Sequence, residues 1–189
     1  LASWLHLTGA AASRLEAAVR RQPLKITPYY LALLRRNDPA DPLRRMVLPD
    51  ARELRTSPGE SADPIGDGGQ HRPAPGLTHR HPDRALLFPT MQCGGYCRYC
   101  FRRCRVGGAD GAWTAAAQRR ALAYIAAHPE IGEVILTGGD PLMLPDAPLL
   151  ALLRRLRRIR HVRLLRLHTR MLAYNPFRIT PALVRGLAA

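Results

Sequence analysis

The sequence is poor in lysine, in acidic residues and in long apolar runs. Its only lysine is Lys25, and 29 basic against 14 acidic residues give a formal net charge of +15. No apolar run approaches the roughly 20 residues that a membrane-spanning helix needs, and no signal peptide is visible. We therefore expect a cytoplasmic protein without a membrane partner. The first residue is Leu1, so we also expect that the natural start lies upstream.

The positive charge comes almost entirely from arginine, in a sequence dominated by Ala, Arg, Leu and Pro. This composition is typical of GC-rich genomes. Aromatic residues make up only 6% of the chain, and no basic stripe interleaved with aromatics, as nucleic-acid binding favours, is present. We interpret the charge as compositional bias and do not expect a nucleic-acid partner.

Cysteine is absent outside one short window. Cys93, Cys97, Cys100 and Cys104 fall within twelve residues. A disulfide framework spreads its cysteines to connect distant segments. A tight group in an otherwise cysteine-free chain indicates a metal or cluster site in a reducing compartment.

The first 78 residues are predicted to form a helical and irregular arm. Residues 1–36 carry Leu, Ala and Arg at helical spacing, interrupted by Pro23 and Pro28. Residues 37–49 are rich in Asp-Pro pairs, which favour turns and extended chain. Residues 56–76 concentrate Pro, Gly, Asp and Ser, which predicts a long irregular segment.

Residues 79–189 alternate between predicted strands and helices. Apolar runs predict strands at 85–88, 133–136 and 162–167, and helical spacing predicts helices at 114–127, 149–159 and 180–189. This alternation predicts an α/β fold with a parallel sheet and helices outside. Three such units cannot close a barrel. We expect an incomplete (β/α) barrel that ends in mid-domain or is completed by another polypeptide.

The spacing C-x3-C-x2-C in Cys93, Cys97 and Cys100 has a specific chemistry. Three thiolates hold three irons of a [4Fe–4S] cluster and leave the fourth iron open. That iron can chelate the amino and carboxylate groups of S-adenosylmethionine, whose sulfonium an electron from the cluster then cleaves to methionine and a 5′-deoxyadenosyl radical. The loop follows a predicted strand, at the edge of the sheet where barrel active sites lie.

Structural zinc is the alternative from a different class of protein. Zinc prefers four ligands, and Cys104 supplies a fourth thiol, so a zinc module that binds nucleic acid through its arginines would also explain the cysteines. Cys104 lies outside the three-cysteine pattern. We expect it to be a free thiol near the site and not a ligand.

Eight segments together resemble the N-terminal portion of the lysine 2,3-aminomutase family, within the radical S-adenosylmethionine superfamily. They span 26–30, 38–43, 75–84, 97–103, 128–131, 136–142, 168–170 and 178–181. The resemblance implies a partial radical-SAM barrel, a [4Fe–4S] cluster, S-adenosylmethionine and pyridoxal 5′-phosphate. The implied reaction moves an amino group from C2 to C3 of an amino acid, with L-lysine as the expected substrate. A flavodoxin or ferredoxin is the expected reductant, and the full-length protein is expected to be a homo-oligomer.

The resemblance also implies roles for individual residues. Cys93, Cys97 and Cys100 match the cluster ligands, and Arg102 matches the arginine that holds the substrate carboxylate. The residues that match cofactor contacts are Tyr99 for adenine, Thr137, Gly138, Gly139 and Asp140 for the amino group of S-adenosylmethionine, and Arg80 and Arg84 for the phosphate of the second cofactor. His79, His81 and His168 are expected to be structural.

Two departures from the family pattern limit these expectations. Lys25 does not stand where the lysine that binds pyridoxal phosphate belongs, so no catalytic residue is predicted in this chain. Residues 171–175 replace a stretch that is usually rich in Val and Pro. We expect cluster assembly without turnover for these 189 residues alone. A lysyl-modifying enzyme that serves a translation elongation factor, and glutamate as substrate, remain the alternatives within the family.

Overall fold

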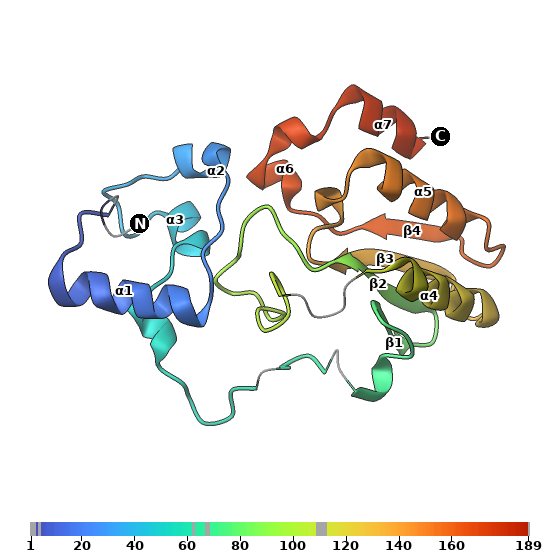
Figure 1. Ribbon diagram of the computed structural model, residues 1–189, viewed down its shortest axis with the longest axis horizontal. Helices are drawn as coiled ribbons and strands as arrows, with labels where there is room; N and C mark the ends of the chain where they lie inside the picture. The colour runs from blue at the N-terminus through green and yellow to red at the C-terminus, as the bar shows by residue number, and fades with distance from the viewer. Residues whose placement is uncertain (1–2, 4, 62, 67–68, 109–112, 189) are drawn as a thin grey trace.

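The computed structural model describes residues 3, 5–61, 63–66, 69–108 and 113–188. Figure 1 shows an N-terminal extension on one side and a sheet covered by helices on the other. The extension contains α1 (Gly9–Arg21), α2 (Pro28–Ala32), α3 (Pro42–Val47) and the 3-10 helix η1 (Ala51–Leu54). None of the helices in these residue ranges combines the length and apolar character that crossing a bilayer requires.

Side-chain caps start the short helices of the extension. The Thr27 hydroxyl accepts a hydrogen bond from the backbone N–H of Tyr30, and Pro28 occupies the first turn of α2. Asp41 caps α3 in the same way, again followed by a proline. The prediction of turns throughout 37–49 was therefore wrong, because an Asp-Pro pair is also a good helix start.

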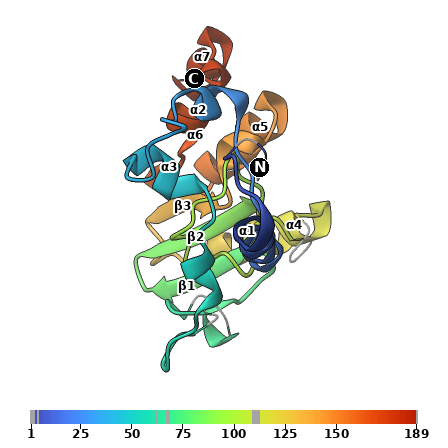
Figure 2. The same cartoon turned by 90° about the vertical axis from the view of Figure 1, so that its left-hand side faces the viewer.

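The extension does not have a core entirely of its own. Tyr30, Leu34, Val47 and Leu48 form a buried cluster that also includes Tyr174 from the C-terminal part of the chain. Figure 2 looks from the extension toward the sheet, with α1 and α3 in front of the strands. The extension is thus packed onto the rest of the molecule through a shared aromatic residue.

The sheet has four strands in the order β1-β2-β3-β4. The strands β2 (Arg84–Thr90), β3 (Glu133–Gly138) and β4 (Leu164–Leu167) are parallel, which confirms the α/β class and the three predicted strands. The strand β1 (Leu77–His81) is antiparallel to β2 and was not predicted. The expected boundary between residues 78 and 79 lies inside β1, because residues 77–90 form a hairpin.

Helices cover one face of the sheet and bury its apolar side chains. The helices are α4 (Ala115–Ala127), α5 (Asp146–Arg157) and α7 (Pro181–Ala188). α4 and α7 lie within predicted segments, and α5 overlaps the segment 149–159 but begins earlier; Ala189, the predicted end of the last helix, lies outside the described residues. Shorter elements are α6 (Met171–Tyr174) and the 3-10 helices η2 (Gly69–His71), η3 (Pro141–Met143) and η4 (Pro176–Arg178). Alternate strand residues and the inner faces of the three long helices form the core; it includes Ala85, Leu87, Val134, Leu136, Leu122, Ile125, Leu149, Leu152 and Leu183.

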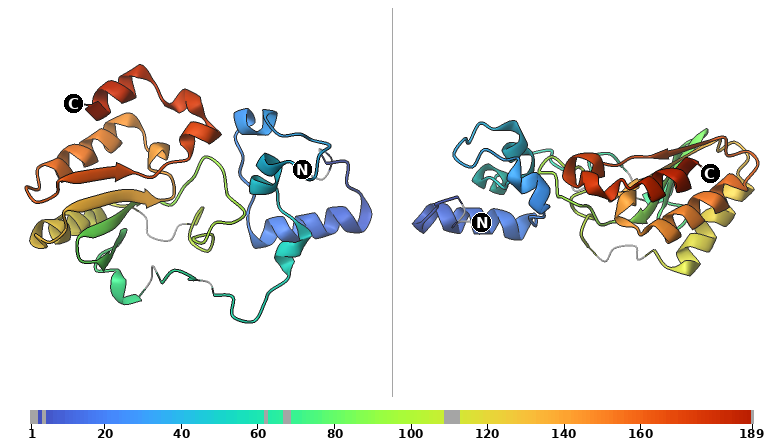
Figure 3. Two further views of the ribbon diagram at one scale, coloured as in Figure 1. Left: turned by 180° about the vertical axis from the view of Figure 1, so that it is seen from behind. Right: turned by 90° about the horizontal axis from the view of Figure 1, so that it is seen from above.

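The parallel strands bring three loops to one edge of the sheet. Residues 91–108, here called the cysteine loop, leave the end of β2 and run between the sheet and the extension (Figure 3). The segments that follow β3 and β4 begin at the same edge. Because the carboxyl ends of parallel strands share an edge, residues far apart in sequence meet beside the cysteine loop.

Candidate cluster-binding site

The base of the cysteine loop is fixed by backbone hydrogen bonds to the segment that follows β3. The N–H of Gly139 donates to the Thr90 carbonyl at 2.9 Å, and the N–H of Asp140 donates to the Gln92 carbonyl at 2.7 Å. A Cβ atom on Gly139 would lie 2.4 Å from the Gln92 oxygen. Gly139 is therefore required because two backbones are in contact at this point.

The outer side of the cysteine loop is hydrogen-bonded to the extension. The N–H of Tyr96 donates to the Lys25 carbonyl at 2.9 Å, and the N–H of Arg98 donates to the Met46 carbonyl at 2.9 Å. The Gln22 side chain donates to the Cys97 carbonyl at 3.0 Å. The loop is thus held between the sheet and the extension, and its shape depends on both.

A buried ion pair reinforces this attachment. The Arg98 side chain is 6% exposed and forms two hydrogen bonds with the Glu53 carboxylate, one of them 3.0 Å from Nε to Oε1. Its Nη1 also donates to the carbonyls of Gln22 and Pro23 at 3.1 and 3.2 Å. Five donors in a planar fork suit such a multiply bonded site. Sequence reasoning assigned no role to Arg98, since its partner lies 45 residues away.

A cavity of about 480 Å³ lies between the cysteine loop and the ends of β3 and β4. It brings together nine of the predicted site residues, which are Cys93, Cys97, Tyr99, Cys100, Arg102, Thr137, Gly138, Gly139 and Asp140. We call this the inner cavity. His168, expected to be structural, also lines it.

Arg80 and Arg84 do not reach the inner cavity. Arg84 is the first residue of β2, at the opposite end of the strand from the cysteine loop, and pairs with Asp83 at 2.7 Å on the surface. Arg80 is exposed on β1 and donates to the carbonyl of Ile65. Their expected role at a cofactor phosphate has no support in this geometry. Likewise, His79 binds the Tyr124 hydroxyl at 3.1 Å, and His81 is exposed on β1.

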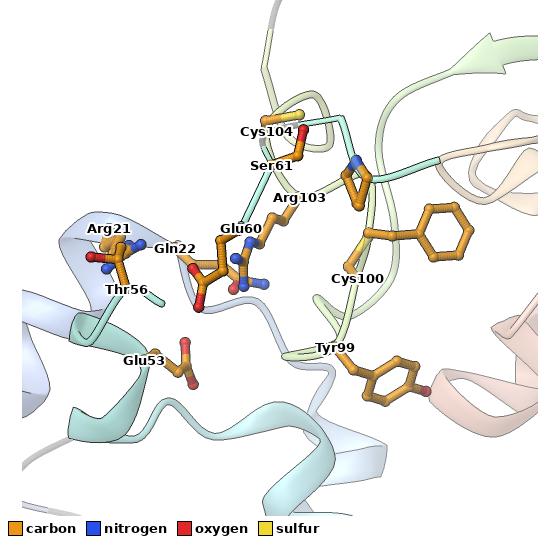
Figure 4. A pocket seen from close by; sticks show the side chains of 12 residues that line it. Arg21, Gln22, Glu53, Thr56, Glu60, Ser61, Tyr99, Cys100, Arg103 and Cys104 are labelled. Atoms are coloured by element: carbon orange, nitrogen blue, oxygen red, sulfur yellow. The ribbon is translucent and has the colours of Figure 1, made fainter. Parts of the chain in front are cut away.

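A second cavity of about 500 Å³ lies on the other side of the cysteine loop (Figure 4). Most of its lining is polar or charged, with Arg21, Gln22, Glu53, Thr56, Glu60, Ser61 and Arg103 beside Cys100 and Cys104. We call this the outer cavity. Figure 4 shows Cys104 next to Ser61, with Arg103 directed toward Glu60. Cys104 lines the outer cavity and Cys93 and Cys97 line the inner one, while Cys100 lines both.

The thiols of Cys93 and Cys100 are difficult to ionise without a metal. Burial, followed by the charges of the Asp140 carboxylate and of the neighbouring thiols, raises the pKa of the Cys93 thiol to about 12. Burial also raises the pKa of Cys100. A metal ion that binds Cys93 or Cys100 must therefore displace the proton of that thiol.

The sequence allows two kinds of metal site, and they require different separations of the sulfur atoms. No three His, Cys, Asp or Glu side chains in the described ranges converge as they would around a single ion. A zinc ion requires sulfurs about 4 Å apart, since Zn–S bonds are about 2.3 Å. In a [4Fe–4S] cluster each thiolate binds a different iron, so the sulfurs stand further apart. The thiols of Cys93, Cys97 and Cys100 all line the inner cavity, as the ligands of such a cluster would.

Asp140 braces the inner cavity from behind. Its carboxylate is 5% exposed and accepts hydrogen bonds from the N–H of Leu142 at 3.0 Å, from the Thr169 hydroxyl at 2.7 Å and from the N–H of Arg170 at 2.7 Å. These partners follow β3 and β4, so Asp140 ties the two strand ends together. This bracing role is additional to the predicted contact with a cofactor amino group.

Sequence reasoning missed two side chains that reach Cys97. Nη1 of Arg170 lies 3.2 Å from the Cys97 sulfur, and the Tyr174 hydroxyl lies 3.2 Å from the same atom. Arg170 belongs to a segment that matched the family, which was a usable signal. Tyr174 lies in the stretch that departs from the family, and nothing in the sequence pointed to it.

Comparison with known proteins places this site in a family. The model of the radical SAM superfamily matches residues 87–188, which include the three cysteines and the ends of all three parallel strands. The chain belongs to the radical SAM superfamily.

Within that superfamily the chain is similar to the amino-acid 2,3-aminomutases. It is 38% identical over 187 residues to the L-lysine 2,3-aminomutase of Clostridium subterminale, which covers 99% of this chain and 45% of that protein. It is 40% identical over 182 residues to the L-lysine 2,3-aminomutase of Escherichia coli, covering 96% and 51%. It is 39% identical over 155 residues to the glutamate 2,3-aminomutase of Clostridioides difficile, covering 82% and 36%.

These similarities confirm the resemblance to lysine 2,3-aminomutases that the sequence motifs indicated. The chain spans about half the length, or less, of the curated relatives it matches.

Proposed function

We propose that this chain holds a [4Fe–4S] cluster on Cys93, Cys97 and Cys100 and binds S-adenosylmethionine beside it in the inner cavity. The observation that carries the proposal is that the three thiols and the segment Thr137–Asp140 line one cavity. When bound, the cluster and S-adenosylmethionine supply a carbon radical that can remove a hydrogen atom from an unactivated C–H bond.

The residues around the cavity suit the parts of such a ligand. Tyr99 is 60% exposed and offers a flat aromatic face, on which we place the adenine. The segment Thr137–Asp140 lines the same cavity at the end of β3, and there we place the amino group. The guanidinium of Arg170 lies 5.5 Å from the centre of the Tyr99 ring and holds that ring against the cavity.

Arg102 is our candidate for binding a substrate carboxylate. It lines the inner cavity, and its guanidinium lies 5.3 Å from the ring centre of Phe88 and 4.7 Å from that of Phe101. The two rings restrict the guanidinium, and its planar fork matches a carboxylate in a two-point contact. An amino acid is the substrate class that this contact and the similar proteins support.

The whole protein's reaction is proposed to be the transfer of an amino group from C2 to C3 of a free amino acid. L-lysine is the proposed substrate, since most of the relatives named above are L-lysine 2,3-aminomutases. A flavodoxin or ferredoxin is the proposed electron donor.

Pyridoxal phosphate does not fit the residues of this segment. Lys25 lies in the extension, with Nζ 5.6 Å from the Tyr96 ring centre, and does not line the inner cavity. Arg80 and Arg84 lie away from that cavity as well. We therefore derive no step through pyridoxal phosphate for this chain, and the amino-group transfer requires groups from outside these 189 residues.

The proposal is tested by cluster reconstitution followed by a cleavage assay. The chain is loaded with iron and sulfide without oxygen, reduced with dithionite and mixed with S-adenosylmethionine. We expect release of methionine and 5′-deoxyadenosine that depends on the cluster. We expect no β-lysine from L-lysine, even with pyridoxal phosphate added. Binding of zinc in place of iron and sulfide, with no methionine released, would contradict the proposal.

A further inference from the structure

The short helix α6 places a tyrosine against the cysteine loop. Tyr174 is 1% exposed, and its hydroxyl lies 3.2 Å from the Cys97 sulfur. A Cβ atom on Gly95 would lie 2.5 Å from Cε1 of the Tyr174 ring. The ring thus lies directly on the loop backbone, at a position that only glycine leaves open.

The Tyr174 ring is held from the side of the extension as well. The Tyr30 ring packs on it with 4.8 Å between ring centres, and the Thr27 hydroxyl donates to the Tyr174 carbonyl. The guanidinium of Arg170 lies 5.4 Å from the centre of the ring on the remaining side. These contacts leave the hydroxyl little freedom to turn away from Cys97.

Arg170 is the second donor to the same sulfur. Its Nη1 lies 3.2 Å from the Cys97 sulfur, and its backbone N–H is bonded to the buried carboxylate of Asp140. An arginine side chain is always charged in proteins and can only donate hydrogen bonds. Cys97 therefore faces one cationic donor and one hydroxyl donor, both from the segment that follows β4.

We propose that Tyr174 is a positioning residue that fixes the Cys97 sulfur and, together with Arg170, raises the reduction potential of the cluster. This inference rests on the proposed function, in which Cys97 is a cluster ligand. Hydrogen bonds to cluster sulfurs are among the factors that set the potential. A donor stabilises the reduced cluster more than the oxidised one, because the reduced cluster carries one more negative charge on its iron and sulfur atoms.

The test is a potentiometric titration of the reconstituted 189-residue chain, followed by EPR, in three variants. Tyr174→Phe keeps the ring and removes only the hydroxyl. Tyr30→Phe is the matched control, because it keeps the ring that packs on Tyr174 and removes a hydroxyl whose hydrogen-bond partners are the Leu43 carbonyl at 3.5 Å and the Met46 sulfur at 3.9 Å. Arg170→Gln removes the charge. We expect the midpoint potential to become more negative in Tyr174→Phe, to fall further in Arg170→Gln and to stay unchanged in Tyr30→Phe.

The outcomes separate the inference from the function beneath it. Equal potentials in Tyr174→Phe and the unchanged chain would overturn the inference while the cluster proposal stands. Loss of the cluster in Tyr174→Phe but not in Tyr30→Phe would support positioning of the sulfur. Its loss in both variants would reduce Tyr174 to a packing role and overturn the inference. If the chain without substitutions takes up no iron and sulfide, both proposals are overturned. Iron analysis before the titration detects this outcome.

Discussion

The two cavities that flank the cysteine loop have almost the same size and very different linings. The inner cavity, of about 480 Å³, is formed by three thiols and by the ends of β3 and β4. The outer cavity, of about 500 Å³, is formed by charged and polar side chains, many of them from the extension. The volume of a cavity alone therefore does not show which of the two is the candidate cluster site. The inner cavity is distinguished by three thiols beside a sheet edge that hydrogen-bonded strands hold in place.

The largest expected effect comes from comparing a cysteine of the inner cavity, Cys97, with a cysteine of the outer cavity, Cys104. Cys97→Ser removes one of three thiolates of the inner cavity, and we expect almost complete loss of bound iron and sulfide, because serine oxygen is a poor substitute for a soft thiolate. Cys104→Ser, in the outer cavity, is the control and should retain the cluster. Iron and acid-labile sulfide analysis after anaerobic reconstitution measures both. Equal loss in the two variants would mean that the four cysteines act as one site.

The next effect concerns the backbone contact at the base of the inner cavity. Gly139→Ala places a Cβ 2.4 Å from the Gln92 carbonyl oxygen, and backbone cannot move aside cheaply. We expect the free energy of unfolding to fall by about 3 kcal/mol. In the control Gly132→Ala, the nearest atom is the flexible end of Arg163 at 3.4 Å, and we expect a change within about 0.5 kcal/mol. Urea denaturation gives both values, and similar losses would indicate that the Gly139 contact is not tight.

A smaller expected effect concerns the ion pair between Arg98 of the cysteine loop and Glu53, which lines the outer cavity. Glu53→Gln leaves the buried Arg98 guanidinium without its ionic partner. Breaking a fully buried pair costs about 3–5 kcal/mol, and we expect about 2 kcal/mol here because Glu53 is partly exposed. The control Glu60→Gln changes an exposed carboxylate of the same cavity and should alter the free energy of unfolding by less than about 0.5 kcal/mol. No difference between the two variants in urea denaturation would contradict a role for the Arg98 pair.

The smallest expected effect concerns the hydrogen bonds that the Asp140 carboxylate accepts beside the inner cavity. Thr169→Val removes one of the three donors to the Asp140 carboxylate, whose two backbone donors remain. The hydroxyl also accepts a hydrogen bond from the N–H of Met171 at 2.9 Å, so two hydrogen bonds are removed and we expect a loss of about 1.5 kcal/mol. Thr56→Val, at the exposed rim of the outer cavity, is the matched control and should be neutral. Thermal unfolding of the pair compares them, and an unchanged Tm in Thr169→Val would show that the backbone donors alone hold Asp140.

The sequence predicted what depends on local patterns. The cysteine loop, the three parallel strands and the three long helices follow from apolar periodicity and spacing. The strand β1 was missed because Thr78, His79 and Arg80 make its pattern polar. The helix α3 was missed because Asp41-Pro42 is compatible with a turn as well as with a helix start.

The contacts that complete the site are tertiary and left no local signal. Arg170 and Tyr174 reach Cys97 across 73 and 77 residues, and Arg98 finds Glu53 across 45. Arg84 was expected at a phosphate because of its place in a family-like segment, but the parallel register puts it at the opposite end of β2. Motif similarity therefore located the three cysteines, while strand register decided which other residues lie near them.

The most direct test of the central claim is EPR of the reduced, reconstituted chain with and without S-adenosylmethionine. The inner cavity is predicted to hold a [4Fe–4S] cluster with one iron free of protein ligands, so the signal of the reduced cluster should change on addition of S-adenosylmethionine. The same change is expected in Cys104→Ser. A [4Fe–4S] signal that S-adenosylmethionine leaves unchanged would contradict an open iron in this cavity, and bound zinc without iron or sulfide would contradict the cluster itself.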